Sequence, residues 1–383
     1  WLAAQPQVEG ALASIVTLPV VEELALRLVG QREVPPVLVL WAILAWFAAY
    51  LVVFVLVSKV RLAAWGFWYF FASGDKKTRK PTDVKVDYRS PSVKRVKVVF
   101  IRHGESEWNA VFNKGSKLTL PLRLVRALVS EMFMLFEPDS LFIDSPLSNV
   151  GIQQAWDLLT FLSAQPAGCT APGVATRPVA DLEVNDIISI IRGDAGESVV
   201  VSSILRRAIS TGLLCLSPRL LKTSPQKEKV LLMTSLQEIS RNVDTLALTP
   251  ARSIPQAPAT EAALKNMGDL MSHFYRSRLD RKYNTGNKTL QQKAVKRQEQ
   301  FASWLFEQKA DTVIVCGHSL WFREFFKSFL PKSIPHEAKT SKMVNCGCVA
   351  FDLYKDSQTL RINPDSIKEV SGGFEVKGKK KKA

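Results

Sequence analysis

Hydrophobic residues follow two patterns along the chain: one long uninterrupted run near its beginning, and short runs separated by mixed stretches further on. The long run, Val37 to Val57, contains no charged residue. At the rise of an α-helix it would be about 30 Å long, which is the thickness of the hydrocarbon core of a bilayer. Buried helices of soluble domains seldom run this far without a polar residue, so we expect a single transmembrane helix at 37–57.

The short apolar runs predict a soluble α/β domain between residues 92 and 356. The expected buried strands are Val96–Ile101, Ser198–Ser203, Lys229–Thr234 and Thr312–Cys316, with Cys348–Tyr354 as a possible edge strand. The expected helices are Gly151–Ser163, Arg207–Cys215, Ala259–Leu279, Leu290–Gln308 and Leu320–Leu330. Strands that alternate with helices favour a mostly parallel sheet covered on both faces, so we expect a three-layer α/β/α sandwich.

The charges around the long apolar run predict its orientation. Basic residues are concentrated after the run, in a linker at 58–91 that is also rich in aromatic residues. Because cytoplasmic flanks carry the excess of Lys and Arg, we expect residues 1–36 on the non-cytosolic side and the soluble domain in the cytosol. The chain opens on Trp1, so its true start is expected to be missing. Residues 357–383 are expected to form a basic C-terminal tail.

Composition narrows the class of partner. The chain has 383 residues and a formal net charge of +16, which favours an anionic partner such as lipid headgroups or nucleic acid. The basic residues flank the apolar run or lie in the tail, without interleaved aromatic residues inside a fold, so lipid is expected and nucleic acid is not. The five cysteines form no C-x-x-C pair and have no histidine at ligand spacing, so we expect neither a zinc site nor a disulfide framework.

Candidate catalytic residues stand just after the expected strands. In a parallel sheet these strand ends lie along one edge, so the side chains that follow them are expected to converge. A lone histidine is usually a structural residue, but histidines, arginines and a carboxylate that gather at one edge indicate a site. The residues in question, in chain order, are Arg102, His103, Arg206, Arg207, Glu238 and His318.

The same residues lie in motifs that resemble those of the histidine phosphatase superfamily, the phosphoglycerate-mutase-like proteins of its first branch. The signature Arg-His-Gly-Glu-Ser-x-Trp-Asn stands at 102–109 and is highly specific. Three further pieces occur in the expected order: Leu-Ser-x-x-Gly at 147–151, Ser-x-Leu-x-Arg-Ala at 203–208 and Gly-His-Ser at 317–319. The resemblance covers residues 93–354 and implies the α/β/α fold of that family, with 92–356 as a histidine phosphatase domain.

The resemblance implies a role for each residue. His103 is the expected nucleophile, which takes up the phosphoryl group as phosphohistidine, and Glu238 is the expected general acid and base. The expected ligands of the phosphoryl oxygens are Arg102, Asn109, Arg207 and His318. Asp244 remains a rival of Glu238, and Arg206 is a weaker candidate than Arg207, because the Arg-Ala pair of the family matches residues 207–208. No metal and no other cofactor is expected.

Three functions are compatible with these residues, two enzymatic and one of binding alone. A metal-independent phosphomonoesterase is favoured, because the chain after Asn109 does not follow the segment with which the mutases read their substrate. The alternatives are a phosphoglycerate-mutase-type phosphomutase and a catalytically idle, membrane-anchored scaffold that binds phosphorylated ligands. The phosphorylated substrate is left open among a small molecule, a lipid and a phosphoprotein.

Two further segments carry expectations. The apolar stretch 118–136 has a narrow polar stripe at Arg123, Arg126 and Ser130, which is compatible with packing on the core, lying on the membrane or closing over the site. In the tail, Lys380 and Lys381 stand fourth and third from the end of the chain. Their position is that of an endoplasmic-reticulum retrieval signal, so that membrane is a candidate location.

Overall fold

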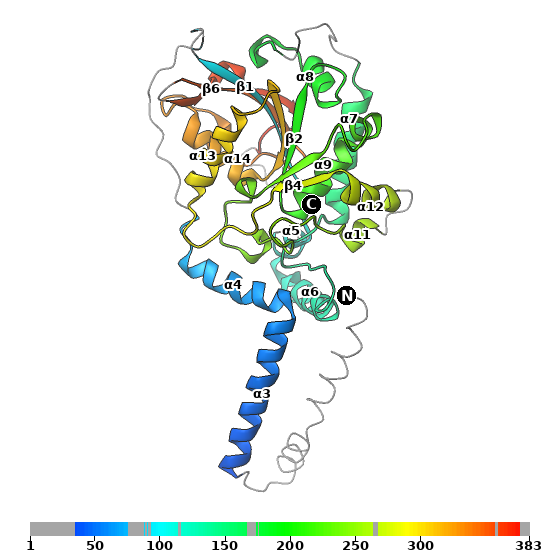
Figure 1. The fold of residues 1–383 in the computed structure, drawn as a ribbon, viewed down its shortest axis with the longest axis vertical. Helices are drawn as coiled ribbons and strands as arrows, with labels where there is room; N and C mark the ends of the chain where they lie inside the picture. Colours follow the sequence, from blue (N-terminus) through cyan, green and yellow to red (C-terminus); the bar gives the residue numbers. More distant parts are fainter. Residues whose placement is uncertain are drawn as a thin grey trace. The chain divides into compact units, whose positions relative to one another are not determined.

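The computed structural model describes residues 35–75, 88, 90, 93–113, 116–166, 174, 176–262, 267–356 and 359–375, in two units (Figure 1). The first unit extends to Ala64 and contains α3, Pro36–Leu56. Proline stands at the start of this helix, where its missing N–H is not needed. The helix is long and apolar enough to cross a membrane, and its ends lie within one residue of the predicted 37–57.

The second unit begins at Trp65 and is built on a central sheet. Among the described residues the strand order is β4-β3-β2-β5-β1-β6-β7, and β8 pairs with β6. The strands are β1 Lys94–Arg102, β2 Ser198–Ser203, β3 Val230–Met233, β4 Leu279–Tyr283, β5 Thr312–Gly317, β6 Cys348–Lys355, β7 Leu360–Ile362 and β8 Lys368–Ser371. The strands from β4 to β1 are parallel, and β6 pairs antiparallel with β1, β7 and β8.

Both faces of the sheet are buried. Because successive side chains of a strand point to opposite faces, a single strand contributes residues to both cores. In β1, Val99 and Ile101 join one hydrophobic core, whereas Val98 and Phe100 join the other. Helices cover each face, on opposite sides of the strands in Figure 1. The first core includes residues of α7 Asn149–Ala164, α8 Val184–Ile191, α9 Arg206–Cys215 and α12 Gly268–Ser277, and the second those of α13 Ala294–Leu305 and α14 Ser319–Phe329. The predicted three-layer α/β/α sandwich with a mostly parallel sheet is confirmed.

Three details differ from the sequence predictions. The predicted edge strand Cys348–Tyr354 is the interior strand β6, which β1 and β7 flank. The predicted helix Ala259–Leu279 ends earlier, since α12 stops at Ser277 and Leu279 opens β4. This strand is exposed along its charged residues, so its apolar pattern is weak. Finally, β7 and β8 lie within 357–383, so the sheet continues into the stretch that the sequence assigned to the tail.

Several predicted segments lie outside the described residues. They are the N-terminal stretch up to residue 34, most of the basic part of the linker at 76–87, and the dilysine-like end of the tail at Lys380 and Lys381.

Candidate active site

The two histidines of the predicted site follow neighbouring strands. His103 comes directly after β1 and His318 directly after β5, and these strands pair in parallel with Arg102 opposite Gly317. The backbone N–H of His103 donates to the carbonyl oxygen of Gly317 at 3.0 Å. As a result the two imidazole rings lie with their centroids 5.0 Å apart. The expected convergence at the carboxyl edge of the sheet therefore holds for this pair.

Two glycines of the motifs are explained by the close approach of two turns. A Cβ atom on Gly104 would lie 2.5 Å from the carbonyl oxygen of Gly151, and a Cβ atom on Gly151 would collide with the carbonyl of Glu105. Ser148 caps the N-terminus of α7 by accepting from the N–H of Gly151, and its hydroxyl donates to the Glu105 carboxylate at 3.0 Å. Glu105 thus ties the histidine turn to α7 without reaching the site.

The surroundings of His103 favour a neutral imidazole that carries its proton on Nδ1. Its Nδ1 lies 2.5 Å from the carbonyl oxygen of Gly104, which can only accept, so Nδ1 carries the proton and donates. The lone pair is therefore on Nε2. Burial lowers the pKa of His103 well below its ordinary value, and the positive charges of Arg207 and Arg102 lower it further. A buried, unprotonated imidazole oriented through its other nitrogen is suited to nucleophilic attack on phosphorus.

Two adjacent arginines at the start of α9 have different environments. Arg206 is buried and its guanidinium pairs with Asp139 at 2.7 Å and with Asp144 at 3.7 Å. Arg207 points to the cavity described below, where its Nη1 donates to the carbonyl oxygen of Asp244 at 2.8 Å. Arg206 is therefore held by carboxylates in the interior and Arg207 lines the cavity, while the role of Arg207 as a phosphate ligand stays a prediction.

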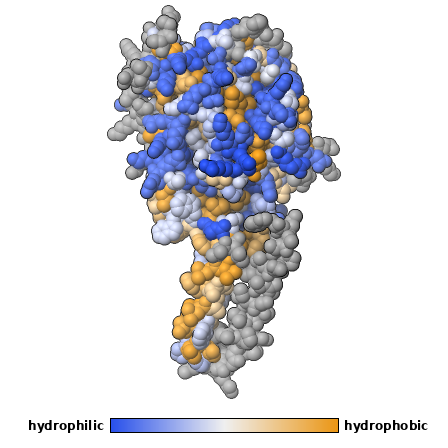
Figure 2. All heavy atoms as spheres, in the orientation of Figure 1, coloured by the Kyte–Doolittle hydropathy of each residue, from blue (hydrophilic) through white to orange (hydrophobic). Residues whose placement is uncertain are grey.

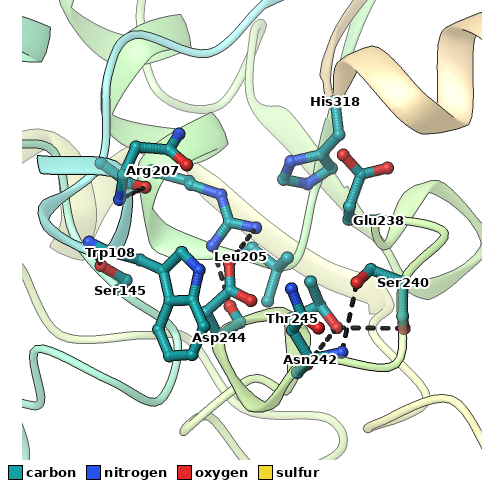
Figure 3. A network of polar contacts seen from close by, with 12 residues as sticks. Trp108, Ser145, Leu205, Arg207, Glu238, Ser240, Asn242, Asp244, Thr245 and His318 are labelled. Atoms are coloured by element: carbon teal, nitrogen blue, oxygen red, sulfur yellow. Dashed lines mark hydrogen bonds and ion pairs between the residues drawn. The ribbon is translucent and has the colours of Figure 1, made fainter. Parts of the chain in front are cut away.

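The acidic residues lie on the loop that follows β3. Glu238 Oε1 accepts from the backbone N–H groups of Ile239 and Trp321, each at 2.8 Å, so its carboxylate is held at the start of α14. Asp244 pairs with Arg207 at 3.5 Å. Burial raises the pKa of Asp244, and Arg207 opposes this shift. Figure 3 shows Arg207 above Asp244, with His318 and Glu238 across the same space. Glu238 faces the histidine side, and Asp244 faces the arginine.

A cavity of about 250 Å³ connects these residues. Its lining includes five of the six predicted site residues: Arg102, His103, Asn109, Arg207 and Glu238. His318 is fully buried and is not among the lining residues, and its Nε2 lies 2.8 Å from the hydroxyl of Ser203. The remaining lining residues are Ser106, Trp108, Asn113, Ser240, Asn242, Asp244, Thr245, Ser319, Leu320 and Lys342.

Two buried nitrogen atoms belong to residues of the predicted site. Nε of Arg102 and Nδ1 of His318 are buried and have no hydrogen-bond partner among the described residues. Buried polar atoms are nearly always paired in proteins, so two unpaired nitrogen atoms beside a cavity suit a ligand rich in acceptors. A phosphoryl group, with its acceptor oxygens and negative charge, is such a ligand.

Sequence reasoning missed several residues that shape the site. Ser203 ends β2 and holds His318, and its place inside the Ser-x-Leu-x-Arg-Ala motif was an available signal. Glu375 pairs with Arg102 at 3.3 Å from the C-terminal stretch, and Lys342 lines the cavity. Neither stands in a motif, so the sequence alone carried no signal for them.

The chain has distant likenesses among solved structures. No family model and no curated protein matches the chain. Among solved structures, it is similar to a putative alpha-ribazole-5'-P phosphatase from Escherichia coli, with 16% identity over 73% of this chain and 98% of that chain and a TM-score of 0.33. It is similar to a phosphoserine phosphatase mutant from Entamoeba histolytica, with 14% identity over 70% and 94% and a TM-score of 0.31. A mycobacterial glucosyl-3-phosphoglycerate phosphatase shares 14% identity over 72% and 97%, with a TM-score of 0.32. These likenesses are too distant to carry over an activity, which must follow from the residues of the chain itself.

Proposed function

We propose that the chain is a phosphomonoesterase that works through a phosphohistidine on His103. The observation that carries the proposal is the neutral imidazole of His103, protonated on Nδ1, which lines the cavity together with Arg102 and Arg207. Phosphoryl transfer gains most from positioning and from charge stabilisation, and the planar guanidinium of arginine matches phosphate oxygens. The site supplies a nucleophile and two such groups.

In the first half of the reaction, Nε2 of His103 attacks phosphorus and the bond to the ester oxygen breaks. Arg102, Arg207, Asn109 and His318 bind the phosphoryl oxygens as negative charge shifts towards the leaving oxygen. The carboxyl group of Glu238 gives its proton to that oxygen, and the alcohol leaves.

In the second half, a water molecule attacks phosphorus on the opposite side from the nitrogen. The carboxylate of Glu238 takes a proton from this water, the bond between phosphorus and Nε2 breaks, and the lone pair returns to the imidazole. Phosphate leaves, and the protonated Glu238 is ready for the next ester. No other co-reactant is needed for the balance.

The test is the release of phosphate from p-nitrophenyl phosphate by the purified full chain, with a chelator present. His103→Ala should abolish the release and the acid-labile phosphoenzyme trapped by rapid quenching. His273→Ala is the matched control, because His273 is an exposed histidine on α12, away from the cavity residues. Retained activity in His103→Ala would exclude the mechanism.

We also propose that α3 anchors the enzyme in a membrane, with the catalytic unit in the cytosol. The absence of charge along the helix and the basic residues that follow it support this topology. An endoplasmic-reticulum location, from the dilysine-like end of the tail, stays a prediction. In intact microsomes, externally added protease should degrade the catalytic unit; full protection of that unit would reverse the topology.

A further inference from the structure

The amphipathic helix α6, Leu120–Phe133, exposes its apolar face and turns its polar face towards the protein. Helices on the surface of a soluble domain bury their apolar face and expose their polar one. In α6 the polar Arg123, Ser130 and Glu131 are partly buried, whereas the apolar Leu122 and Phe133 are 73% and 83% exposed. The apolar side therefore has no partner within the described residues.

The polar side of α6 holds the helix against the rest of the second unit. Nε of Arg123 donates to the carbonyl oxygen of Val111 in α5, Glu107–Phe112, at 3.1 Å. The carboxylate of Glu131 accepts from the hydroxyl of Ser140 at 2.7 Å and from the N–H of Leu141 at 2.8 Å. These polar contacts fix which face points outward. The outward apolar residues on and beside the helix are Leu118, Leu122, Val125, Leu128, Val129, Met132, Phe133 and Phe136.

A second exposed apolar face lies on the last part of α4, Ser58–Ala72. Within the second unit, Tyr69 turns inward and is fully buried. The exposed aromatic residues of this part are Phe67, Trp68, Phe70 and Phe71. Figure 2 shows apolar side chains gathered at the lower end of the second unit, below a largely hydrophilic surface, where Figure 1 draws α6 and this part of α4. Such a concentration of exposed apolar side chains marks an interaction surface.

Both faces are attached to elements that line the active-site cavity. The α6 helix packs on α5, which carries the lining residues Trp108 and Asn109. The α4 segment packs on the loop 239–246, where a Cβ atom on Gly66 would lie 2.8 Å from Val243. That loop supplies Ser240, Asn242, Asp244 and Thr245 to the cavity lining. Whatever covers these faces therefore lies next to the rim of the site.

We infer that α6 and the aromatic residues of α4 dock on the interface of a lipid bilayer, next to the proposed active site. The inference rests on the proposed anchor, because Phe67 follows the end of α3 by only about eleven residues, which is about 16 Å of helix. A face so close along the chain to a membrane span stays within reach of the bilayer surface. Trp and Phe are suited to the headgroup level, and the exposed charged residue within α6, Arg126, has the sign that anionic lipid attracts.

The test places an environment-sensitive fluorophore on the full chain, reconstituted into nanodiscs of phosphatidylcholine with one fifth phosphatidylserine. Leu122→Cys and Val129→Cys carry the probe on the outward face of α6. Leu221→Cys is the matched control, an exposed leucine on α10, Ser217–Lys222. The parent chain measures labelling of the native cysteines. We expect the emission of both α6 probes to shift to the blue and to be quenched severalfold more by doxyl-labelled lipid than that of the control.

Two outcomes would overturn the docking surface. The first is quenching at α6 no greater than at the control position. The second is a blue shift without lipid quenching, with disulfide cross-links at α6 between two copies, which would assign the face to a second copy. Release of phosphate from p-nitrophenyl phosphate and resistance to carbonate extraction, measured on the same parent protein, report the activity and the anchor separately. Failure of the docking surface alone leaves both of those readouts intact.

Discussion

The cavity has two walls that are built in different ways. One wall consists of residues at strand ends, where His103 follows β1 and Arg207 follows the turn after β2. The other wall is the loop from Glu238 to Thr245, which belongs to no long helix or strand. The first wall is basic and is positioned by the sheet itself. The second wall is acidic, and its position must come from somewhere else.

A buried group of charges holds the loop wall in place. Asp75 pairs with Lys288 at 2.8 Å and with Arg297 at 2.5 Å, and all three side chains are fully buried. Nζ of Lys288 also donates to the carbonyl oxygens of Glu238 and Ser240, each at 2.6 Å. The position of His103 therefore depends on local strand geometry, whereas the position of Glu238 depends on charges brought together from distant parts of the chain.

The largest expected effect is on the acidic wall. If Glu238 is the proton donor, Glu238→Gln should lower kcat by about 10²–10⁴-fold, the usual range for general acid–base catalysis. The loss should be larger for an alkyl phosphate than for p-nitrophenyl phosphate, because an alkoxide needs the proton more. Steady-state kinetics on the two esters measure it.

Asp244→Asn is the matched variant, since Asp244 pairs with Arg207 on the same loop. If Arg207 binds phosphate and Glu238 is the acid, the variant should raise KM more than it lowers kcat, because it disturbs the position of Arg207 and leaves the proton donor intact. A fall in kcat larger than that of Glu238→Gln, with the same dependence on the leaving group, would make Asp244 the acid.

The next effect concerns the charges beneath the loop. Asp75→Ala leaves Lys288 and Arg297 buried without their carboxylate, and breaking a buried pair in this way costs about 3–5 kcal/mol of unfolding free energy. Urea unfolding of the full chain in detergent, followed by circular dichroism, measures the loss. Lys222→Ala is the control, because its pair with Asp194 lies at the surface and should contribute at most about 1 kcal/mol. If Asp75→Ala and Lys222→Ala lowered the free energy of unfolding equally, the buried charges of Asp75, Lys288 and Arg297 would not support the loop.

The two walls also differ in how far the sequence predicts them. The sequence predicts that Arg102, His103, Arg207 and His318 lie close together, because each follows an apolar run and the sheet brings such positions to one edge regardless of what lies between them. The sequence does not predict the charges that support Glu238, because Asp75 is 213 residues from Lys288 in the chain. No local sequence pattern predicts an ion pair between residues so far apart in the chain. The sequence also does not determine which face of α6 points outward, because the polar contacts of Arg123 and Glu131 with other segments fix the orientation of the helix.

The smallest expected effect is on the pH dependence of the free energy of unfolding, to which the two walls contribute in different pH ranges. Burial lowers the pKa of His103 and His318, so below about pH 6.5 the unfolded chain binds protons that the folded chain does not. The contribution of these two histidines to stability should therefore fall with falling pH in that range, by up to about 1.4 kcal/mol per pH unit for each histidine. Glu261, whose pKa burial raises to about 8, contributes with the opposite sign, so the histidine contribution is measured as the difference between the parent chain and a histidine variant. Burial also lowers the pKa of Lys288 from 10.5 to about 8, so its contribution has the same sign but lies between about pH 8 and 10.5, where stability should rise with pH.

Urea unfolding at a series of pH values distinguishes the two contributions. His318→Asn should flatten the acid side of the stability curve and leave the alkaline side as it is, because only the strand-end wall loses a buried base. Lys288→Met should reduce the rise on the alkaline side and leave the acid side as it is, even though it also lowers stability overall by uncovering Asp75. Part of the rise should remain, because burial also lowers the pKa of Lys97 to about 8. If either variant altered both sides equally, the walls would titrate as one unit, and the separation between a wall set by the sheet and a wall set by distant charges would be wrong.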